Sequence, residues 1–385
     1  MSTQISPSDA SRLSDDIYTV NENITSYKAF LKDSLFDSNA KSTLTASVGG
    51  RFFLSAKDGF GVCVKGAGNY KNDAFLIFRG TTTANHKADF LTDANAGLTR
   101  AASGELVHVG FNYTFNSMLA QITEFFDKNP ISGTVHCIGH SLGGAVASLA
   151  ADWIKKKRGN SVKLYTFGAP RVGTALFSKS TTQSINIENM HRVYHATDPV
   201  PMVALYPFMQ APYNAHSHYI ASSELVFSGV AHKMKKYRGS VKDKSWRNIN
   251  GVPDQPYNVE YAIEQWLKSN RYTSAGSATF LRWAESALIF VLKKIGMHAV
   301  FALQGAVMGV STLADKLAYI LHKGIDLASH ISYWVIRFAR RIMQALGMRA
   351  PDDEKDFTQA MIRTALLRLT SNAYQAANLA VMNMA

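Results

Sequence analysis

Cysteine and charge are scarce in this sequence, and it does not open on a long apolar run. Of its 385 residues only Cys63 and Cys137 are cysteines, both inside apolar stretches, which indicates two buried thiols and excludes a disulfide framework. With 18% charged and 46% hydrophobic residues, a large globular core is expected. The first residues lack the basic and apolar parts of a signal peptide. We therefore expect synthesis in the cytoplasm, with a specialised secretion system as the route to a target-cell membrane.

Positive charge is unevenly distributed along the chain. The formal net charge is +13, and two regions supply most of it. Residues 233–247 contain seven basic residues and one acid, and residues 277–349 contain nine basic residues and three acids. Such clusters predict an anionic partner, and we expect a membrane surface. Tyr237 and Trp246 interleave with the first cluster, but no nucleic-acid motif accompanies it, so no nucleic acid partner is expected.

The motif with the most chemical content is Gly139-His140-Ser141-Leu142-Gly143. An apolar run at 135–138 precedes it, and an apolar pattern of helical spacing follows it as far as Arg158-Gly159. This order of strand, sharp turn and helix is typical of a nucleophile elbow, in which glycines are needed because a Cβ would collide with a neighbouring element. Ser141 is then exposed beside a helix N-terminus, which favours developing negative charge. The pattern predicts acyl-transfer chemistry at Ser141.

A serine nucleophile needs a base, and the base needs a carboxylate to orient it. In folds with such an elbow the chain order is Ser, then Asp or Glu, then His. Asp152, Glu188 and Asp198 are the carboxylates between Ser141 and the next loop histidine. Asp152 falls in the elbow helix and Glu188 in a polar stretch, whereas Asp198 directly follows a predicted strand. We therefore predict Asp198 as the acid.

The base must be chosen among twelve histidines. Four precede the serine, and two lie in the strand before Asp198, so chain order disfavours them: these are His86, His108, His136, His140, His191 and His195. His216 and His218 lie on a loop that enters a strand predicted at 224–227. We predict His218 as the base, with His216 as the alternative. His232 stands among lysines and is expected to be solvated.

The order of elements predicts an α/β fold with a mostly parallel sheet wrapped by helices. Short strands are expected at 60–65, 73–78, 161–167 and 190–196, with helices between the later ones. We divide the chain into a helical lead at 1–48, an α/β-hydrolase-like domain at 49–275 and a helical, basic region at 276–385. The strand at 73–78 ends in Arg79-Gly80-Thr81, where a hydrolase places its second oxyanion-hole element.

Six ordered motifs resemble the class 3, fungal-lipase-like family of α/β-hydrolases over residues 60–229. They are Arg79-Gly80-Thr81, DFLTD at 89–93, HVGF at 108–111, GHSLGG at 139–144, TFGAPRVG at 166–173 and RVYHATDPVP at 192–201. The resemblance implies Ser141 as nucleophile, Asp198 as acid, His218 as base, and Thr81 with the Leu142 amide as oxyanion hole. It also implies a lid at 82–90, and no metal or cofactor. The glycine that this family has just after its histidine is missing here.

The C-terminal region changes in composition. From Ser277 proline is absent until Pro351, and apolar residues recur at helical spacing. Residues 295–314 lack Asp, Glu, Lys and Arg over twenty positions, enough to span a bilayer, although polar residues and glycines favour a buried or interfacial helix. The pattern of residues 332–349 predicts a cationic amphipathic helix that lies on an anionic membrane or packs onto the rest of the protein.

Together these features predict a serine ester hydrolase, of lipase or phospholipase type, that cleaves membrane glycerolipids and docks through its basic helices. A bacterial effector injected into another cell, with an immunity or chaperone partner, is one hypothesis for its setting. The alternative is a non-enzymatic membrane-binding protein on a hydrolase scaffold.

Overall fold

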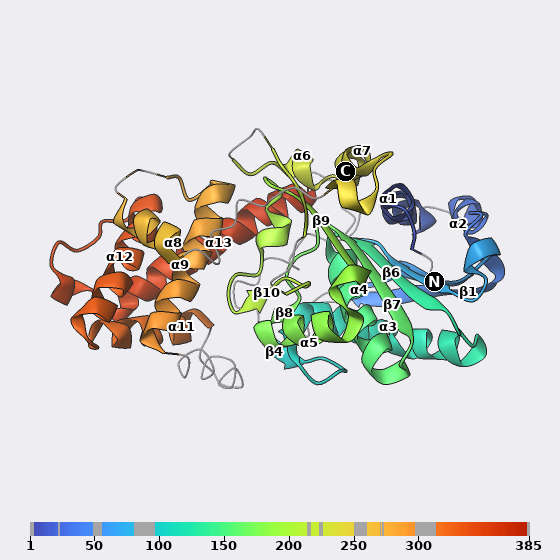
Figure 1. Cartoon of the computed structure of the whole chain (residues 1–385), viewed down its shortest axis with the longest axis horizontal. Helices are drawn as coiled ribbons and strands as arrows, with labels where there is room; N and C mark the ends of the chain where they lie inside the picture. The colour runs from blue at the N-terminus through green and yellow to red at the C-terminus, as the bar shows by residue number, and fades with distance from the viewer. Residues whose placement is uncertain are drawn as a thin grey trace.

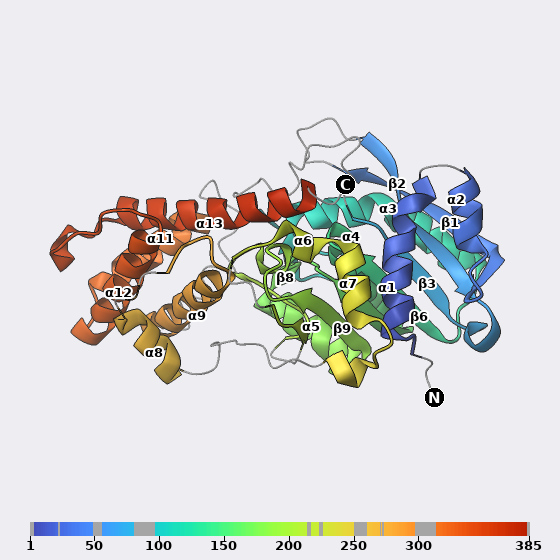
Figure 2. The same cartoon turned by 90° about the horizontal axis from the view of Figure 1, so that it is seen from above.

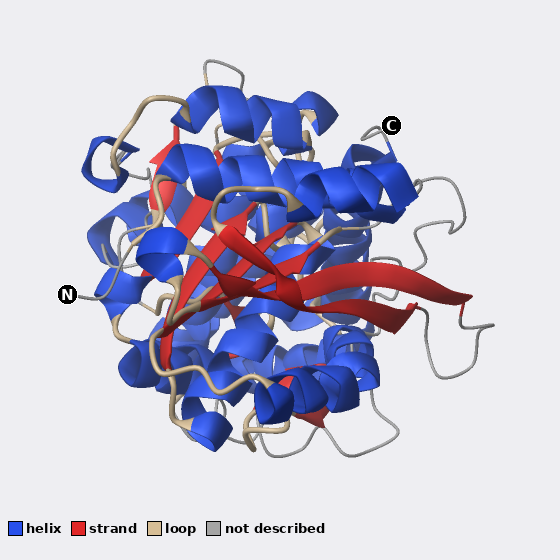
Figure 3. Cartoon of the chain, turned by 90° about the vertical axis from the view of Figure 1, so that its right-hand side faces the viewer, coloured by secondary structure: helices blue, strands red, loops and turns tan. Residues whose placement is uncertain are grey.

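The computed structural model describes residues 4–21, 24–48, 56–80, 97–213, 217–222, 226–249, 260–269, 271, 273–296 and 313–382. Its centre is a seven-stranded sheet of order β1-β2-β3-β6-β7-β9-β11 (Figures 1 and 3). The strands β3, β6, β7, β9 and β11 run parallel, while β1 and β2 are antiparallel additions at one edge. The predicted mostly parallel sheet is confirmed.

The apolar runs of the sequence form the central strands of the sheet, whereas the edge strand β1 is mostly polar. The strands of the large sheet are β1 Phe36–Val48, β2 Ala56–Gly66, β3 Ala74–Phe78, β6 Thr134–His140, β7 Ser161–Phe167, β9 Met190–His195 and β11 His218–Ile220. A smaller sheet of order β10-β8-β5-β4 contains β4 Leu98–Arg100, β5 Leu106–His108, β8 Gly173–Thr174 and β10 Phe208–Met209. Strands β3 and β6 are buried at every residue, so both faces of the sheet are covered at its centre.

Helices cover both faces of the large sheet. Helices α3 Val109–Lys128, α4 Leu142–Trp153 and α5 Ala175–Ile185 pack on one face, and α1 Pro7–Asp16 with α7 Met234–Val241 pack on the other (Figure 2). The pleat of β3 shows the division, because Leu76 and Phe78 belong to the first core while Phe75 and Ile77 belong to the second. Cys63 and Cys137 are buried free thiols, as predicted.

The N-terminal lead is shorter than predicted. Helices α1 and α2 Ile24–Leu31 are present, but Phe36–Val48 is strand β1 and pairs along its length with β2. Phe36 begins this strand and packs against Phe75 with ring centroids 5.3 Å apart. Strand pairing across the edge of the sheet outweighs the local helical pattern.

The C-terminal region is helical, as predicted. Its helices are α8 Glu260–Lys268, α9 Ala278–Ile295, α11 Leu313–Ile325, α12 Ser329–Ala345 and α13 Gln359–Met382 (Figure 1). They share one core with residues 200–208 of the α/β part, including Val200, Met202 and Phe208. Helix α13 runs back from this group of helices and reaches α6 Gly229–His232 beside the sheet (Figure 2).

A buried ion pair joins the two parts of the chain. Arg171, in the turn after β7, donates from Nη2 to Oε2 of Glu285 in α9 across 2.6 Å, and both side chains are 4% exposed. The Arg171 amide also donates to the Val203 carbonyl at 2.8 Å. Separating α9 from the sheet would leave two charges buried without a partner, which is strongly unfavourable.

No described helix is long and apolar enough to cross a membrane. Most of the predicted candidate span at 295–314 lies outside the described residues.

Candidate active site

Ser141 lies at the predicted corner between β6 and α4. Its backbone has φ 56° and ψ −129°, a conformation that a non-glycine residue adopts only under strain. A Cβ added to Gly139 would lie 2.2 Å from the Gly143 carbonyl oxygen, and one added to Gly143 would lie 2.2 Å from that of Phe78. Glycine at these two positions therefore lets the helix start so close to the strand that the serine side chain is held at the turn.

A chain of hydrogen bonds links Ser141 to a histidine and an aspartate. The Ser141 hydroxyl donates to Nε2 of His232 across 2.9 Å, and Nδ1 of His232 donates to Oδ2 of Asp198 across 2.8 Å. All three are buried, with 2% exposure for Ser141 and none for the other two. The geometry assigns the His232 tautomer that is protonated on Nδ1, which leaves Nε2 free to accept the serine proton.

The carboxylate of Asp198 is fixed by further donors. The Tyr237 hydroxyl donates to Oδ2 across 2.6 Å, and the Val200 amide donates to Oδ1 across 2.9 Å. Burial, reinforced by the charge of Asp198, raises the pKa of Tyr237 well above its usual range, so this hydroxyl stays protonated and keeps donating. Hydrogen bonds to both carboxylate oxygens thus fix the orientation of Asp198.

The prediction of His218 as the histidine next to Ser141 is wrong. His218 pairs with Val193, which pairs with Phe167, which pairs with His140, so His218 lies level with the elbow but three strands away. Three strand spacings correspond to about 14 Å, too far for a hydrogen bond. Nε2 of His218 instead accepts from Nδ1 of His191 across 3.0 Å. The alternative, His216, lies outside the described residues.

His232 was missed because its sequence neighbours are lysines. It is the last residue of α6, and its ring points inward while Lys235 and Lys236 of α7 are exposed. Short helices change direction within a few residues, so charged neighbours in sequence say little about the side chain between them. His218 begins β11, the last strand of the large sheet, and His232 is the next described histidine after that strand.

The oxyanion-hole predictions lie partly outside the described structure. Thr81 and the proposed lid at 82–90 are not among the described residues. Leu142 is the first residue of α4, where backbone N–H groups have no partner within the helix. The residue before Thr81 is well fixed, because the Gly80 amide donates to the Tyr18 hydroxyl at 3.0 Å and its carbonyl accepts from Arg79 at 3.0 Å.

Two more histidines hold the backbone around His232. The Tyr18 hydroxyl, already an acceptor from Gly80, donates to Nδ1 of His140 across 2.7 Å, and Nε2 of His140 donates to the His232 carbonyl across 2.8 Å. Nδ1 of His195 donates to the Ala231 carbonyl across 2.5 Å. Burial lowers the pKa of His140 and of His195, so each is held as a neutral ring with its proton on the donating nitrogen.

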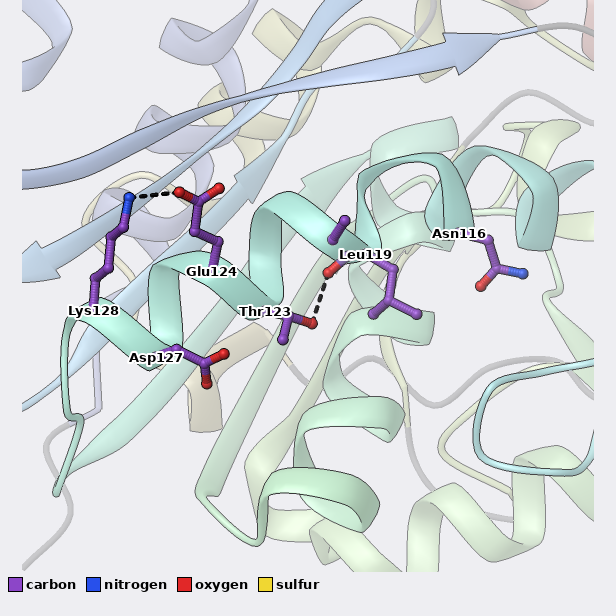
Figure 4. A pocket seen from close by; sticks show the side chains of 7 residues that line it. Asn116, Leu119, Thr123, Glu124, Asp127 and Lys128 are labelled. Atoms are coloured by element: carbon purple, nitrogen blue, oxygen red, sulfur yellow. Dashed lines mark hydrogen bonds and ion pairs between the residues drawn. The ribbon is translucent and has the colours of Figure 1, made fainter.

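A surface hollow on α3 is separate from the Ser141 site. This hollow, of about 730 Å³, lies along α3, on the outside of the sheet, and none of its lining residues belongs to the Ser141 site (Figure 4). Its lining is Asn116, Leu119, Ala120, Thr123, Glu124, Asp127 and Lys128. The ion pair between Lys128 and Glu124 bridges consecutive turns, as on an ordinary solvated helix face. Within the described residues no group of three or more His, Cys, Asp or Glu side chains is arranged to hold a metal.

Comparison with known proteins finds a family match in the central part of the chain. Residues 75–208 match the lipase (class 3) family. The resemblance predicted from the six sequence motifs is therefore confirmed over these residues.

Individual relatives match parts of the chain. A secreted mono- and diacylglycerol lipase of Fusarium solani is 34% identical over 154 residues, which are 38% of this chain and 44% of that protein. A chloroplastic phospholipase A(1) of Arabidopsis thaliana is 33% identical over 133 residues, 28% of this chain and 29% of that protein. Less than half the length of these relatives is therefore matched. Among solved structures, Rhizomucor miehei triacylglyceride lipase has 22% identity and a TM-score of 0.39 and covers 56% of this chain and 78% of its own.

Proposed function

We propose that this protein is a carboxylic ester hydrolase that cleaves acyl esters of glycerolipids. The observation that carries the proposal is the buried chain of hydrogen bonds from Ser141 through His232 to Asp198. Similarity to acylglycerol lipases and to a phospholipase A(1) supports a lipid ester as the substrate.

In the proposed mechanism, His232 removes the Ser141 proton as the serine oxygen attacks the ester carbonyl. Asp198 stabilises the resulting imidazolium and keeps its ring in place. The Leu142 amide and, as the family resemblance implies, Thr81 donate hydrogen bonds to the ester carbonyl oxygen as it becomes negative. The imidazolium then protonates the departing alcohol. Water, deprotonated by the same histidine, releases the fatty acid and restores Ser141.

Access to the serine requires movement. Ser141 is 2% exposed, so an ester carbonyl reaches its hydroxyl only after neighbouring groups shift. An opening step that is favoured at a lipid surface fits a glycerolipid substrate in a membrane, which we propose over a water-soluble ester.

The test is fatty-acid release from vesicles that contain both phospholipid and diacylglycerol. The full chain should release fatty acid, and Ser141→Ala should reduce release by about 10⁴-fold or more. Separate assay of each lipid class identifies which ester is cleaved. Loss of no more than a few-fold in Ser141→Ala would contradict the proposed function.

The same variant separates enzymatic from non-enzymatic membrane damage. Delivery into another cell as an effector stays a prediction, and with it the immunity or chaperone partner. Expression of the full chain in the bacterial periplasm should disrupt membranes if the effector hypothesis is right, and Ser141→Ala should be harmless. Equal damage by both proteins would favour a membrane-binding protein on a hydrolase scaffold.

A further inference from the structure

Helix α12 contains most of the cationic segment 332–349, for which the sequence predicts either binding to an anionic membrane or packing onto the rest of the protein. In α12 the apolar side chains Val335, Phe338 and Ile342 are buried in the C-terminal core. Arg341 is 6% exposed and donates to the Arg271 carbonyl, and Arg340 donates to the Asp352 carbonyl across 2.8 Å. An amphipathic helix binds a bilayer through its apolar face, and this face already contacts protein.

The first basic cluster is arranged in the opposite way. In α7 the apolar side chains Met234, Tyr237 and Val241 point into the core beneath the sheet. The cations of the segment point outward. The exposed ones are Lys235, Lys236, Arg238, Lys242, Lys244 and Arg247.

Few carboxylates neutralise this cluster. Arg238 pairs with Asp15 at 3.1 Å and with Asp16 at 3.5 Å, both on α1. Lys235, Lys236 and Lys242 have no ion pair among the described residues, and Asp243 is the one acid within residues 233–247. Two further acids, Asp9 in α1 and Asp33 just after α2, form ion pairs with Arg12. The outward face of α7 therefore carries a net positive field.

Two exposed apolar side chains come shortly before the cations in the sequence. Val226 and Val230 are each 60% exposed, and Val230 lies two residues before His232 in the same short helix. Cations with adjacent exposed apolar side chains match a lipid surface, which offers anionic headgroups above an apolar layer. We call residues 226–249 the α6–α7 segment.

We propose that the α6–α7 segment is the surface that docks an anionic lipid bilayer, with its lysines on the headgroups and Val226 and Val230 in contact with the acyl layer. This inference rests on the proposed function, since it places the docked bilayer beside the histidine that activates Ser141. It assigns membrane docking to this segment and not to α12.

A nucleic acid fits this surface less well. Binding of single strands uses exposed aromatic rings on which bases stack. Tyr237 and Trp246, which interleave with the basic residues, are buried at 0% and 9% exposure. Contact with nucleic acid would be limited to phosphates, and the exposed valines would have no role in it.

The test measures binding of the intact Ser141→Ala chain to vesicles of phosphatidylglycerol and phosphatidylcholine, so that no lipid is consumed. A triple variant, Lys235→Gln with Lys236→Gln and Lys242→Gln, should bind about 100-fold more weakly at low salt, because each lysine contributes about 5-fold near an anionic surface. Val226→Ser with Val230→Ser should reduce the binding that persists at about 0.5 M salt, where headgroup attraction is screened.

The matched control removes the same charge from the C-terminal region, with Arg349→Gln, Lys355→Gln and Arg368→Gln, all exposed. It should bind vesicles within about 2-fold of the parent. Equal losses in the two triple variants, no loss in the lysine triple, or lysine-dependent binding of duplex DNA without vesicle binding would overturn the proposal. With Ser141 intact, both triples should hydrolyse a soluble short-chain ester normally. Absence of fatty-acid release from phospholipid and diacylglycerol vesicles by the wild type would refute the proposed function and leave the docking result standing.

Discussion

Two groups of buried histidines lie on the same side of the sheet and differ in what they contact. The site group, His140, His195 and His232, binds the serine, the aspartate or the backbone next to them. The sheet group consists of His136, His191 and His218, whose partners are other side chains of the core. His136 is hydrogen-bonded to Asp73, and His191 to His218. Trp246 stacks on His191 with ring centroids 4.1 Å apart. Burial lowers the pKa of His140 in one group and of His191 in the other.

The difference teaches that burial and a perturbed pKa do not by themselves mark a base. Nε2 of His191 accepts from the Gln4 amide, and its Nδ1 donates to His218, so both nitrogens are used within the core. His232 has one nitrogen on a carboxylate and the other on a hydroxyl that can be deprotonated. The partner of the second nitrogen separates a structural histidine from a base.

Replacing the base itself should give the largest contrast between the two groups. His232→Ala should lower kcat for ester hydrolysis by about 10⁴-fold or more, because no other described imidazole contacts Ser141. His218→Ala should keep kcat within about 10-fold, since its effect is on packing. Steady-state kinetics on a soluble ester measures both, and thermal unfolding verifies that each variant is folded. A larger loss in His218→Ala would reverse the assignment.

The backbone supports of His232 should have an intermediate effect. His140→Asn removes the donor to the His232 carbonyl, and Tyr18→Phe removes the hydroxyl that joins Gly80 to His140. Each should lower kcat by about 10-fold to 100-fold, which corresponds to one lost buried hydrogen bond. KM should change little, because neither side chain is placed to touch the substrate. A change in KM alone would show that these residues act on binding.

Acid should destabilise the protein through both groups. The pKa of His191 is lowered to about 3 by burial, by His218 and by Lys163, whereas in the unfolded chain a histidine titrates near 6.5. The unfolded state therefore binds the proton first, and stability that is complete above about pH 6.5 is lost as the pH falls toward 3, by about 1.4 kcal/mol per pH unit for this one group. Urea unfolding from pH 7 to pH 4 measures the slope.

The matched variant for this measurement is His191→Gln. It removes one titrating group from the sheet and leaves the site group intact, so its slope should be shallower than that of the wild type. An unchanged slope would mean that His191 is not buried as a neutral ring.

The smallest effect is expected at Tyr237. Tyr237→Phe removes one of the two described donors to the Asp198 carboxylate while the Val200 amide remains. We expect a loss in kcat of about 3-fold to 10-fold, since Asp198 keeps its position. Steady-state kinetics on a soluble ester measures the change, and a loss of about 100-fold or more would contradict this supporting role.

Local sequence was sufficient for the parts of the site that depend on local structure. The elbow at Ser141 follows from glycine spacing between a strand and a helix, and Asp198 follows from chain order and from its place after β9. His232 could not be found in this way, because its approach to Ser141 depends on how α6 folds back over the ends of the strands. Charge along the chain was also a poor guide to exposure, as the buried Arg171 and Arg341 show.

The 3-10 turn Val200–Met202, which begins two residues after Asp198, is packed against α13 and belongs to the core of the C-terminal helices. The Val200 amide in this turn is also a donor to the Asp198 carboxylate. Side chains on α13 thus border the turn whose Val200 amide helps to orient Asp198. Mutations that repack this helix should be able to tune turnover from a distance, and laboratory evolution for faster variants has reason to sample it.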